Sequence, residues 1–125
     1  MVYLLDTNII IRFLVGDDEK FLMKSQEYFE QIEKALIEVE IVDGVLMESY
    51  FVLTKFYKLP KNEVLDDLKT ILSLSGVVNS NKLILFETLS IMQNKNIDFV
   101  DALICAKAKL EGYTKLSFDS DVIKC

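Results

Sequence analysis

The length, composition and charge of the chain limit the kinds of protein that it can be. Its 125 residues, 51% of them hydrophobic, suit one domain that spans residues 1–125 and has a substantial core. Histidine is absent, which excludes Ser-His-Asp and Cys-His catalysis and any histidine-ligated zinc or iron. The net charge of −6 argues against a broad basic face for nucleic acid, so an anionic substrate would need a bound cation.

The apolar stretches and the cysteines narrow the cellular setting. No apolar stretch approaches the roughly 20 residues of a membrane span, and the chain start lacks the basic region of a signal peptide. We therefore expect a cytoplasmic protein. The two cysteines provide neither a disulfide framework nor a four-ligand zinc set, so we expect Cys105 to be a small buried hydrophobe and Cys125 part of a frayed end.

The first half of the chain alternates apolar strands with helices. Residues 2–5 read as a short buried strand that ends at Asp6 and turns directly into a helix capped by Thr7 and Asn8. The following pattern predicts a helix over 19–37, a strand over 39–42, and a helix over 43–57 that is apolar almost all round and therefore largely buried. Another helix follows Pro60 and ends at Gly76, and residues 77–78 suggest a very short strand.

The second half continues the same alternation. The segment 79–81 caps a helix that runs to a turn at 94–96, a further helix covers 99–110 and stops at Gly112, and residues 113–118 form the last predicted strand. Connections too long for hairpins indicate a parallel sheet covered on both faces. The prediction is an α/β fold, a three-layer α/β/α sandwich with a short central parallel sheet of four or five strands.

Four carboxylates stand at positions that solvation alone does not explain. Asp6 and Asp119 each follow a predicted strand, so both would project from the same edge of a parallel sheet. Glu48 interrupts the apolar run of its helix, and Asp101 lies one turn into another helix. If these acids converge, their mutual repulsion would raise their pKa values or push them apart unless a cation neutralised the cluster.

Each acid also has a purely structural explanation. Asp6 and Asp98 suit the N-cap of a helix, and Asp101 suits the first turn, where a negative charge meets the helix dipole. Glu48 is harder to explain in this way, because an ionised carboxylate is rarely buried without a partner. Partners are few, since Arg12 is the only arginine of the chain.

The residue types in the predicted site select both the metal and the reaction. Hard oxygen ligands without histidine or cysteine favour Mg²⁺ or Mn²⁺ over zinc or copper. Such ions serve phosphoryl transfer, in which they activate water and stabilise charge on the phosphate. The pattern therefore predicts a metal-dependent nuclease or phosphatase.

At these residues the chain resembles the PIN-domain nucleases, and among them the VapC-type toxins of toxin–antitoxin pairs. The matching pieces occur in the family's order and span nearly the whole chain: Leu4-Leu5-Asp6-Thr7-Asn8, Glu48 within residues 46–53, Asp101-Ala102-Leu103-Ile104 after Ile97-Asp98-Phe99, and Phe118-Asp119-Ser120-Asp121. No single piece is specific, whereas the set is.

The resemblance implies a fold, an activity and a site. It implies an α/β/α fold and an endoribonuclease that uses Mg²⁺ or Mn²⁺. The implied metal-ligating and catalytic acids are Asp6, Glu48, Asp101 and Asp119, with Thr7 as a supporting hydroxyl, Asn8 fixing the loop that carries Asp6, and Asp121 or Asp98 in the outer shell. A homodimer and a small antitoxin protein whose tail occupies the site are the implied partners.

Three other functions are compatible with parts of the pattern. A PIN-domain nuclease could serve RNA maturation instead of a toxin–antitoxin pair, and a PIN-like scaffold could keep the fold without the activity. An aspartyl-phosphate phosphatase also carries Asp after its first strand, but its pattern needs a second Asp where this chain has Asn8. The presence of all four acids argues against the scaffold.

Overall fold

The structure is mostly helical with one small parallel sheet. It is a computed structural model that describes residues 1–125, and it confirms the mixed α/β class predicted from the sequence. The chain forms two compact units, Met1–Ser80 and Asn81–Cys125. None of the helices is both long enough and apolar enough to cross a membrane.

The sheet belongs to the first unit. Strands β1 (Val2–Leu4) and β2 (Glu38–Glu40) pair in parallel, with Tyr3 opposite Val39. On its other side, the Val39 N–H donates to the Gly76 carbonyl at 2.7 Å and the Val39 carbonyl accepts from the Val78 N–H at 2.9 Å. The strand predicted at 77–78 is therefore a single parallel bridge between Val39 and Val77.

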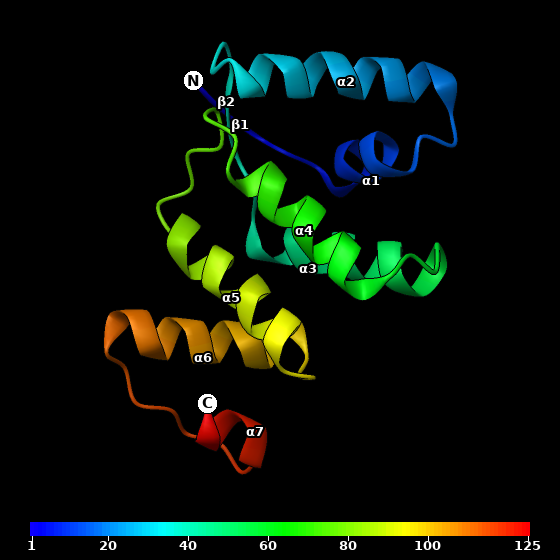
Figure 1. The fold of residues 1–125 in the computed structure, drawn as a ribbon. Helices are drawn as coiled ribbons and strands as arrows, with labels where there is room; N and C mark the ends of the chain where they lie inside the picture. Colours follow the sequence, from blue (N-terminus) through cyan, green and yellow to red (C-terminus); the bar gives the residue numbers. More distant parts are fainter. The chain divides into compact units, whose positions relative to one another are not determined.

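Five helical segments complete the first unit. They are α1 (Thr7–Val15), α2 (Glu19–Glu33), α3 (Asp43–Phe51), the π-helical turn η1 (Val52–Phe56) and α4 (Lys61–Leu72). Figure 1 shows β1 leading into α1. Helix α2 ends before the predicted residue 37, because Ala35 adopts a left-handed φ of 56°. The π-helical turn continues α3 over most of the range predicted as one helix.

Helix α3 and its continuation are less buried than predicted. Leu46, Ser49 and Leu53 are buried, whereas Glu48 is exposed and Phe56 is 74% exposed. The spacing of the buried residues places them on one stripe, so the segment covers the core with a single face despite its apolar composition. The expectation of a largely buried helix was wrong.

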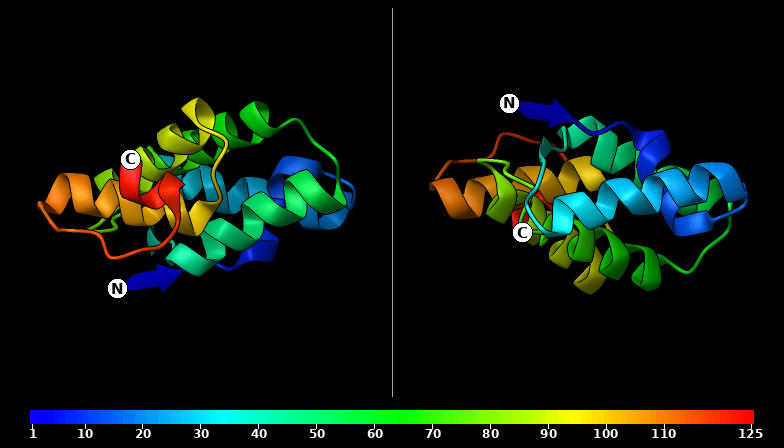
Figure 2. Two further views of the ribbon diagram at one scale, coloured as in Figure 1. Left: turned by 90° about the horizontal axis from the view of Figure 1, so that it is seen from below. Right: turned by 90° about the horizontal axis from the view of Figure 1, so that it is seen from above.

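The second unit contains three helices. Helices α5 (Lys82–Asn94) and α6 (Phe99–Glu111) match the predicted ranges closely and pack against each other (Figure 2). The short helix α7 (Ser120–Lys124) was not predicted and packs against α6. Gly112 ends α6 with a left-handed φ of 70°, a conformation that suits glycine.

The predicted sheet of four or five strands is larger than the one observed. The strand expected over residues 113–118 is absent, and the second unit contains no strand with which it could pair. Leu116 and Phe118 are fully exposed there. A lone extended segment has no ladder of hydrogen bonds, so apolar content alone does not make it a strand.

The two cysteines are joined, which corrects the expectation of a buried hydrophobe and a frayed end. Cys105 is buried on α6 and forms a disulfide with Cys125, their Cα atoms lying 5.8 Å apart. This separation is typical of disulfides. Helix α7 brings the end of the chain back to α6. The spacing of the cysteines in the sequence did not reveal this return.

Candidate functional site

Asp6 lies directly after the first strand, as predicted, and begins the helix that follows. The Leu5 N–H donates to the Glu40 carbonyl at 3.1 Å, so the chain leaves β2 just before Asp6. One carboxylate oxygen of Asp6 accepts a hydrogen bond from the Thr7 N–H at 2.9 Å, which makes Asp6 the N-cap of α1. The cap role that the sequence left open is present, and this hydrogen bond uses one of the two carboxylate oxygens.

Glu48 and Asp6 line the same hollow of the first unit. The hollow has a volume of about 340 Å³ and is lined by Asp6, Thr7, Asn8, Ile11, Arg12, Glu48, Val52 and Tyr57. Glu48 lies on α3, and its side chain is exposed to solvent. The structure thus brings together four of the predicted site residues: Asp6, Thr7, Asn8 and Glu48.

The Thr7 hydroxyl is a buried polar group of this hollow without a partner. Its Oγ1 atom is buried and makes no hydrogen bond. Leaving a buried hydroxyl unsatisfied costs about 1–3 kcal/mol, so such groups normally have a partner. The Thr7 hydroxyl is therefore a donor without an acceptor in this structure.

Three residues of this region were not assigned to the site from the sequence. The Arg12 guanidinium lies 3.3 Å from an Asp17 carboxylate oxygen, and the Tyr57 hydroxyl donates to the other oxygen of Asp17 at 3.1 Å. Burial, and then the hydrogen bond to Asp17, raise the pKa of the Tyr57 hydroxyl, so it stays protonated as a donor. The one signal in the sequence was that Arg12 is the only arginine and follows Asn8 by one helical turn.

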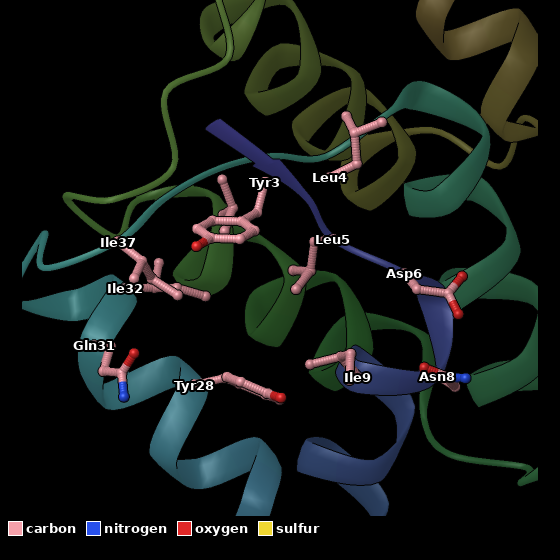
Figure 3. A pocket seen from close by; sticks show the side chains of 11 residues that line it. Tyr3, Leu4, Leu5, Asp6, Asn8, Ile9, Tyr28, Gln31, Ile32 and Ile37 are labelled. Carbon is pink, nitrogen blue, oxygen red and sulfur yellow. The ribbon is translucent and has the colours of Figure 1, made fainter. Parts of the chain in front are cut away.

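A second hollow of the first unit also reaches Asp6 and Asn8. It has a volume of about 380 Å³, and residues of β1, α2 and the following segment line it. Figure 3 shows Asp6 and Asn8 at one end and Gln31, Ile32 and Ile37 at the other. Apart from Asp6, this hollow contains no charged side chain, so it adds no further acid to the candidate site.

In the second unit, Asp101 is surrounded by other acids. It lies in the first turn of α6. Desolvation raises the pKa of the Asp101 carboxyl above its usual range, and the negative charges of Asp119, Asp98 and Asp121 raise it further. Like charges favour protonation in this way when carboxylates share a neighbourhood. The structure therefore brings the predicted acids of the second unit into one electrostatic group.

The structural explanations for the other acids of this group are partly realised. Asp119 is the N-cap of α7, and its carboxylate accepts a hydrogen bond from the Asp121 N–H at 2.8 Å. Asp98 occupies the N-cap position of α6 but makes no side-chain hydrogen bond there. Its carboxylate is exposed and contributes mainly its charge.

The donor atoms of both acid groups fit a hard divalent cation. Each unit contributes carboxylate oxygens and no histidine, the donor chemistry that suits Mg²⁺ or Mn²⁺. Within either unit, no three Asp, Glu, His or Cys side chains are arranged to hold a metal ion. Asp6 and Glu48 supply two candidate donors in the first unit, and Asp101 and Asp119 supply two in the second.

Comparison with known proteins identifies the family of the chain. The family model described as the PIN domain matches residues 3–124. The chain belongs to the PIN domain family. A VapC ribonuclease of Aquifex aeolicus (strain VF5) is 26% identical to this PIN domain over 109 residues, which cover 87% of the present chain and 80% of that protein. No solved structure matches this chain significantly. The resemblance noted from the four motifs is confirmed.

Proposed function

We propose that the chain is a Mg²⁺- or Mn²⁺-dependent endoribonuclease that hydrolyses RNA phosphodiester bonds, and that it is the toxin of a toxin–antitoxin pair. The observation that carries the proposal is the hollow in which Asp6 and Glu48 lie together with the unpartnered Thr7 hydroxyl. The VapC ribonuclease relative supports RNA as the substrate. The oxygen donors and the absence of histidine support the metal.

The proposed metal site belongs to one domain, residues 1–125. Asp6, Glu48, Asp101 and Asp119 are its proposed ligands and catalytic acids, and a metal held by them would activate water and stabilise charge on the phosphate. The match to the PIN domain, which extends over residues 3–124, supports treating the two units as one domain. The raised pKa of Asp101 supports a role in which a cation offsets its neighbours' charge.

The remaining predicted residues have supporting roles in this proposal. The Thr7 hydroxyl donates a hydrogen bond to a carboxylate or a substrate oxygen, which would satisfy its buried Oγ1 atom. Asn8 orients the loop that carries Asp6. The backbone N–H of Asp121 holds the Asp119 carboxylate, and the Asp121 side chain is proposed as a supporting acid.

The proposal includes a fuller version of the fold. It is a three-layer α/β/α sandwich whose central parallel sheet has four or five strands, more than the pair β1–β2. The parallel bridge between Val39 and Val77, on the other side of β2, supports a sheet of more than two strands.

The proposed partners and location follow from the similarity to the VapC ribonuclease. A small antitoxin protein would occupy the site, and two copies of the chain would form a homodimer in the cytoplasm. Large apolar side chains that remain exposed, such as Met23, Leu36 and Phe56, are compatible with such interfaces.

Cleavage of RNA by the purified protein tests the proposal. We expect cleavage of single-stranded or looped RNA with Mg²⁺ or Mn²⁺, its loss in EDTA, and its recovery when metal is restored. Glu48→Gln should reduce cleavage at least about 100-fold, because a carboxylate ligand is replaced by an amide. Glu33→Gln is the matched control, since Glu33 is exposed on α2 outside the hollow. Cleavage that survives complete chelation would contradict the proposal, and a folded protein that binds RNA without cleaving it would indicate the scaffold.

A further inference from the structure

Arg12 is the one cationic side chain in the hollow that contains Asp6 and Glu48. It lies on α1 one turn after Asn8, so both side chains lie on the same face of the helix. The three residues before it in the sequence are uncharged, and the whole chain carries a charge of −6. An RNA backbone entering this hollow would therefore meet two carboxylates and a single fixed positive charge.

The guanidinium of Arg12 is held in place by two contacts. Its Nη1 atom lies 3.3 Å from an Asp17 oxygen, and its central carbon lies 5.1 Å from the centre of the Phe21 ring. The Tyr57 hydroxyl binds the second oxygen of Asp17 at 3.1 Å. Because Tyr57 also lines the hollow, Asp17 is anchored from two sides. The side chain of Arg12 thus has a defined position beside the acids.

The contacts of Arg12 leave it able to bind an anion. The guanidinium has five N–H donors, of which the ion pair with Asp17 uses one. The side chain is 37% exposed. Arginine binds phosphate through paired, charge-assisted hydrogen bonds, and these are among the stronger polar contacts in proteins. Its location, orientation and free donors all suit a phosphate at the edge of the hollow.

We infer that Arg12 binds a backbone phosphate of the RNA next to the bond that is cleaved, and that Asp17 and Tyr57 position its guanidinium. The inference rests on the proposed function and adds a substrate-binding residue to it. Arg12 contacts a phosphate that does not react, so its loss should weaken substrate binding more than it slows the chemical step. The competing explanation is that Arg12 and Asp17 only join α1 to the turn before α2.

Four variants separate these explanations: Arg12→Met removes the charge, Arg12→Lys keeps it without the planar fork, Asp17→Asn removes the partner, and Lys34→Gln is the control. Lys34 is an exposed cation of the same unit that pairs with Glu30 outside the hollow, so its variant matches the change in net charge. Steady-state cleavage of a single-stranded RNA that the parent protein cleaves gives KM and kcat. Thermal melts of each protein without RNA report any change in the fold.

The inference predicts a specific order of effects. Arg12→Met should raise KM about tenfold, the size of one charge-assisted hydrogen bond, and change kcat by less than about threefold. Arg12→Lys should raise KM by a smaller factor. Asp17→Asn should raise KM by a smaller factor than Arg12→Met, because it releases the guanidinium from its position without removing it, and Lys34→Gln should leave KM within about twofold of the parent value.

A second measurement does not depend on turnover. Binding of a single-stranded DNA oligonucleotide with the same sequence is followed at several salt concentrations with Mg²⁺ present. The slope of log K against log salt should fall by about 0.7 in Arg12→Met, because one phosphate contact with a single strand is lost. If Arg12→Met does not fold, Arg12→Lys and Asp17→Asn still distinguish the two explanations.

Distinct results overturn the inference and the proposed function. If Arg12→Met leaves KM and the salt slope unchanged, whether or not it lowers the melting temperature, Arg12 is a structural residue and the nuclease assignment stands. If the parent protein cleaves no RNA with either metal, the proposed function fails and the role of Arg12 fails with it.

Discussion

The carboxamide of Asn79 closes two hydrogen bonds with the backbone of Ile41. The Ile41 N–H donates to Asn79 Oδ1 at 2.8 Å, and Asn79 Nδ2 donates to the Ile41 carbonyl at 2.7 Å. Both residues are buried. Ile41 lies between β2 and α3, so the side chain of Asn79 takes the place of a neighbouring strand and fixes the start of the helix that carries Glu48.

Replacing Asn79 should therefore destabilise the protein. Asn79→Ala leaves a buried N–H and a buried carbonyl without partners, and we expect a loss of about 2–4 kcal/mol in the free energy of unfolding. Urea denaturation followed by circular dichroism measures it. Asn62→Ala, on the exposed face of α4, is the matched control and should change stability by less than about 0.5 kcal/mol. Equal losses in the two variants would show that the paired hydrogen bonds contribute nothing.

Asp101→Asn should be neutral or stabilising in the metal-free protein at neutral pH. The pKa of Asp101 is raised in the folded state, so the folded protein binds its proton more tightly than the unfolded chain does. Its ionised form therefore lowers stability above the folded pKa, and this loss disappears as pH falls to the ordinary aspartate value of about 3.9. The expected gain is below about 1 kcal/mol, because the site is accessible to solvent.

Thermal melts of Asp101→Asn and the parent protein, with and without Mg²⁺, test this account. Any gain in melting temperature should be largest near neutral pH and vanish near pH 4. Mg²⁺ should stabilise the parent through binding to the folded state and should stabilise the variant less. A variant that is clearly less stable without metal and keeps the full Mg²⁺ shift would identify Asp101 as an acid that only supports the start of α6.

The disulfide between Cys105 and Cys125 should stabilise the second unit. It closes a loop with a sequence separation of 20, for which the chain-entropy estimate is about 3 kcal/mol. Oxidised parent protein should thus unfold at a higher denaturant concentration than Cys105→Ser, and the difference should shrink to the cost of the substitution after reduction. Thiol titration under denaturing conditions confirms the oxidation state. No difference between oxidised and reduced parent protein would contradict this contribution.

The pH dependence of cleavage should lack the signature of histidine. The chain has no side chain with an ordinary pKa near 6.5, and Asp101 must be ionised to serve as a ligand. We expect kcat/KM at fixed metal concentration to rise with pH through the acidic range and to show no fall near neutrality. A bell-shaped profile centred near pH 7, with saturating metal and folded protein, would count against the acid-only site.

The features that the sequence predicted are those encoded by neighbouring residues. Asp6 was placed correctly because a short apolar strand, a capping acid and a helix follow one another directly. Asp101 and Gly112 were placed by the periodicity and termination of a single helix. Local pattern was therefore sufficient for α6 and for the corner that carries Asp6.

The features that the sequence missed depend on distant residues. Asn79 bonds to a residue 38 positions away, and Cys105 to one 20 positions away, so neither contact has a local signal. Residues 113–118 have the pattern of a strand but lie in a unit without one. The position of Arg12 beside Asp6 and Glu48 likewise depends on how α1 and α3 pack, which periodicity does not specify.

The central proposal is that Asp6, Glu48, Asp101 and Asp119 all serve the same metal site. Isothermal titration of Mn²⁺ into the parent protein, Asp6→Asn and Asp101→Asn tests it most directly, with Glu33→Gln as the control. The account predicts that either aspartate substitution weakens Mn²⁺ binding at least about tenfold, although the two residues lie in different units, and that the control binds as the parent does. If Asp6→Asn abolishes binding while Asp101→Asn leaves the affinity and stoichiometry unchanged, the acids of the second unit do not belong to the site.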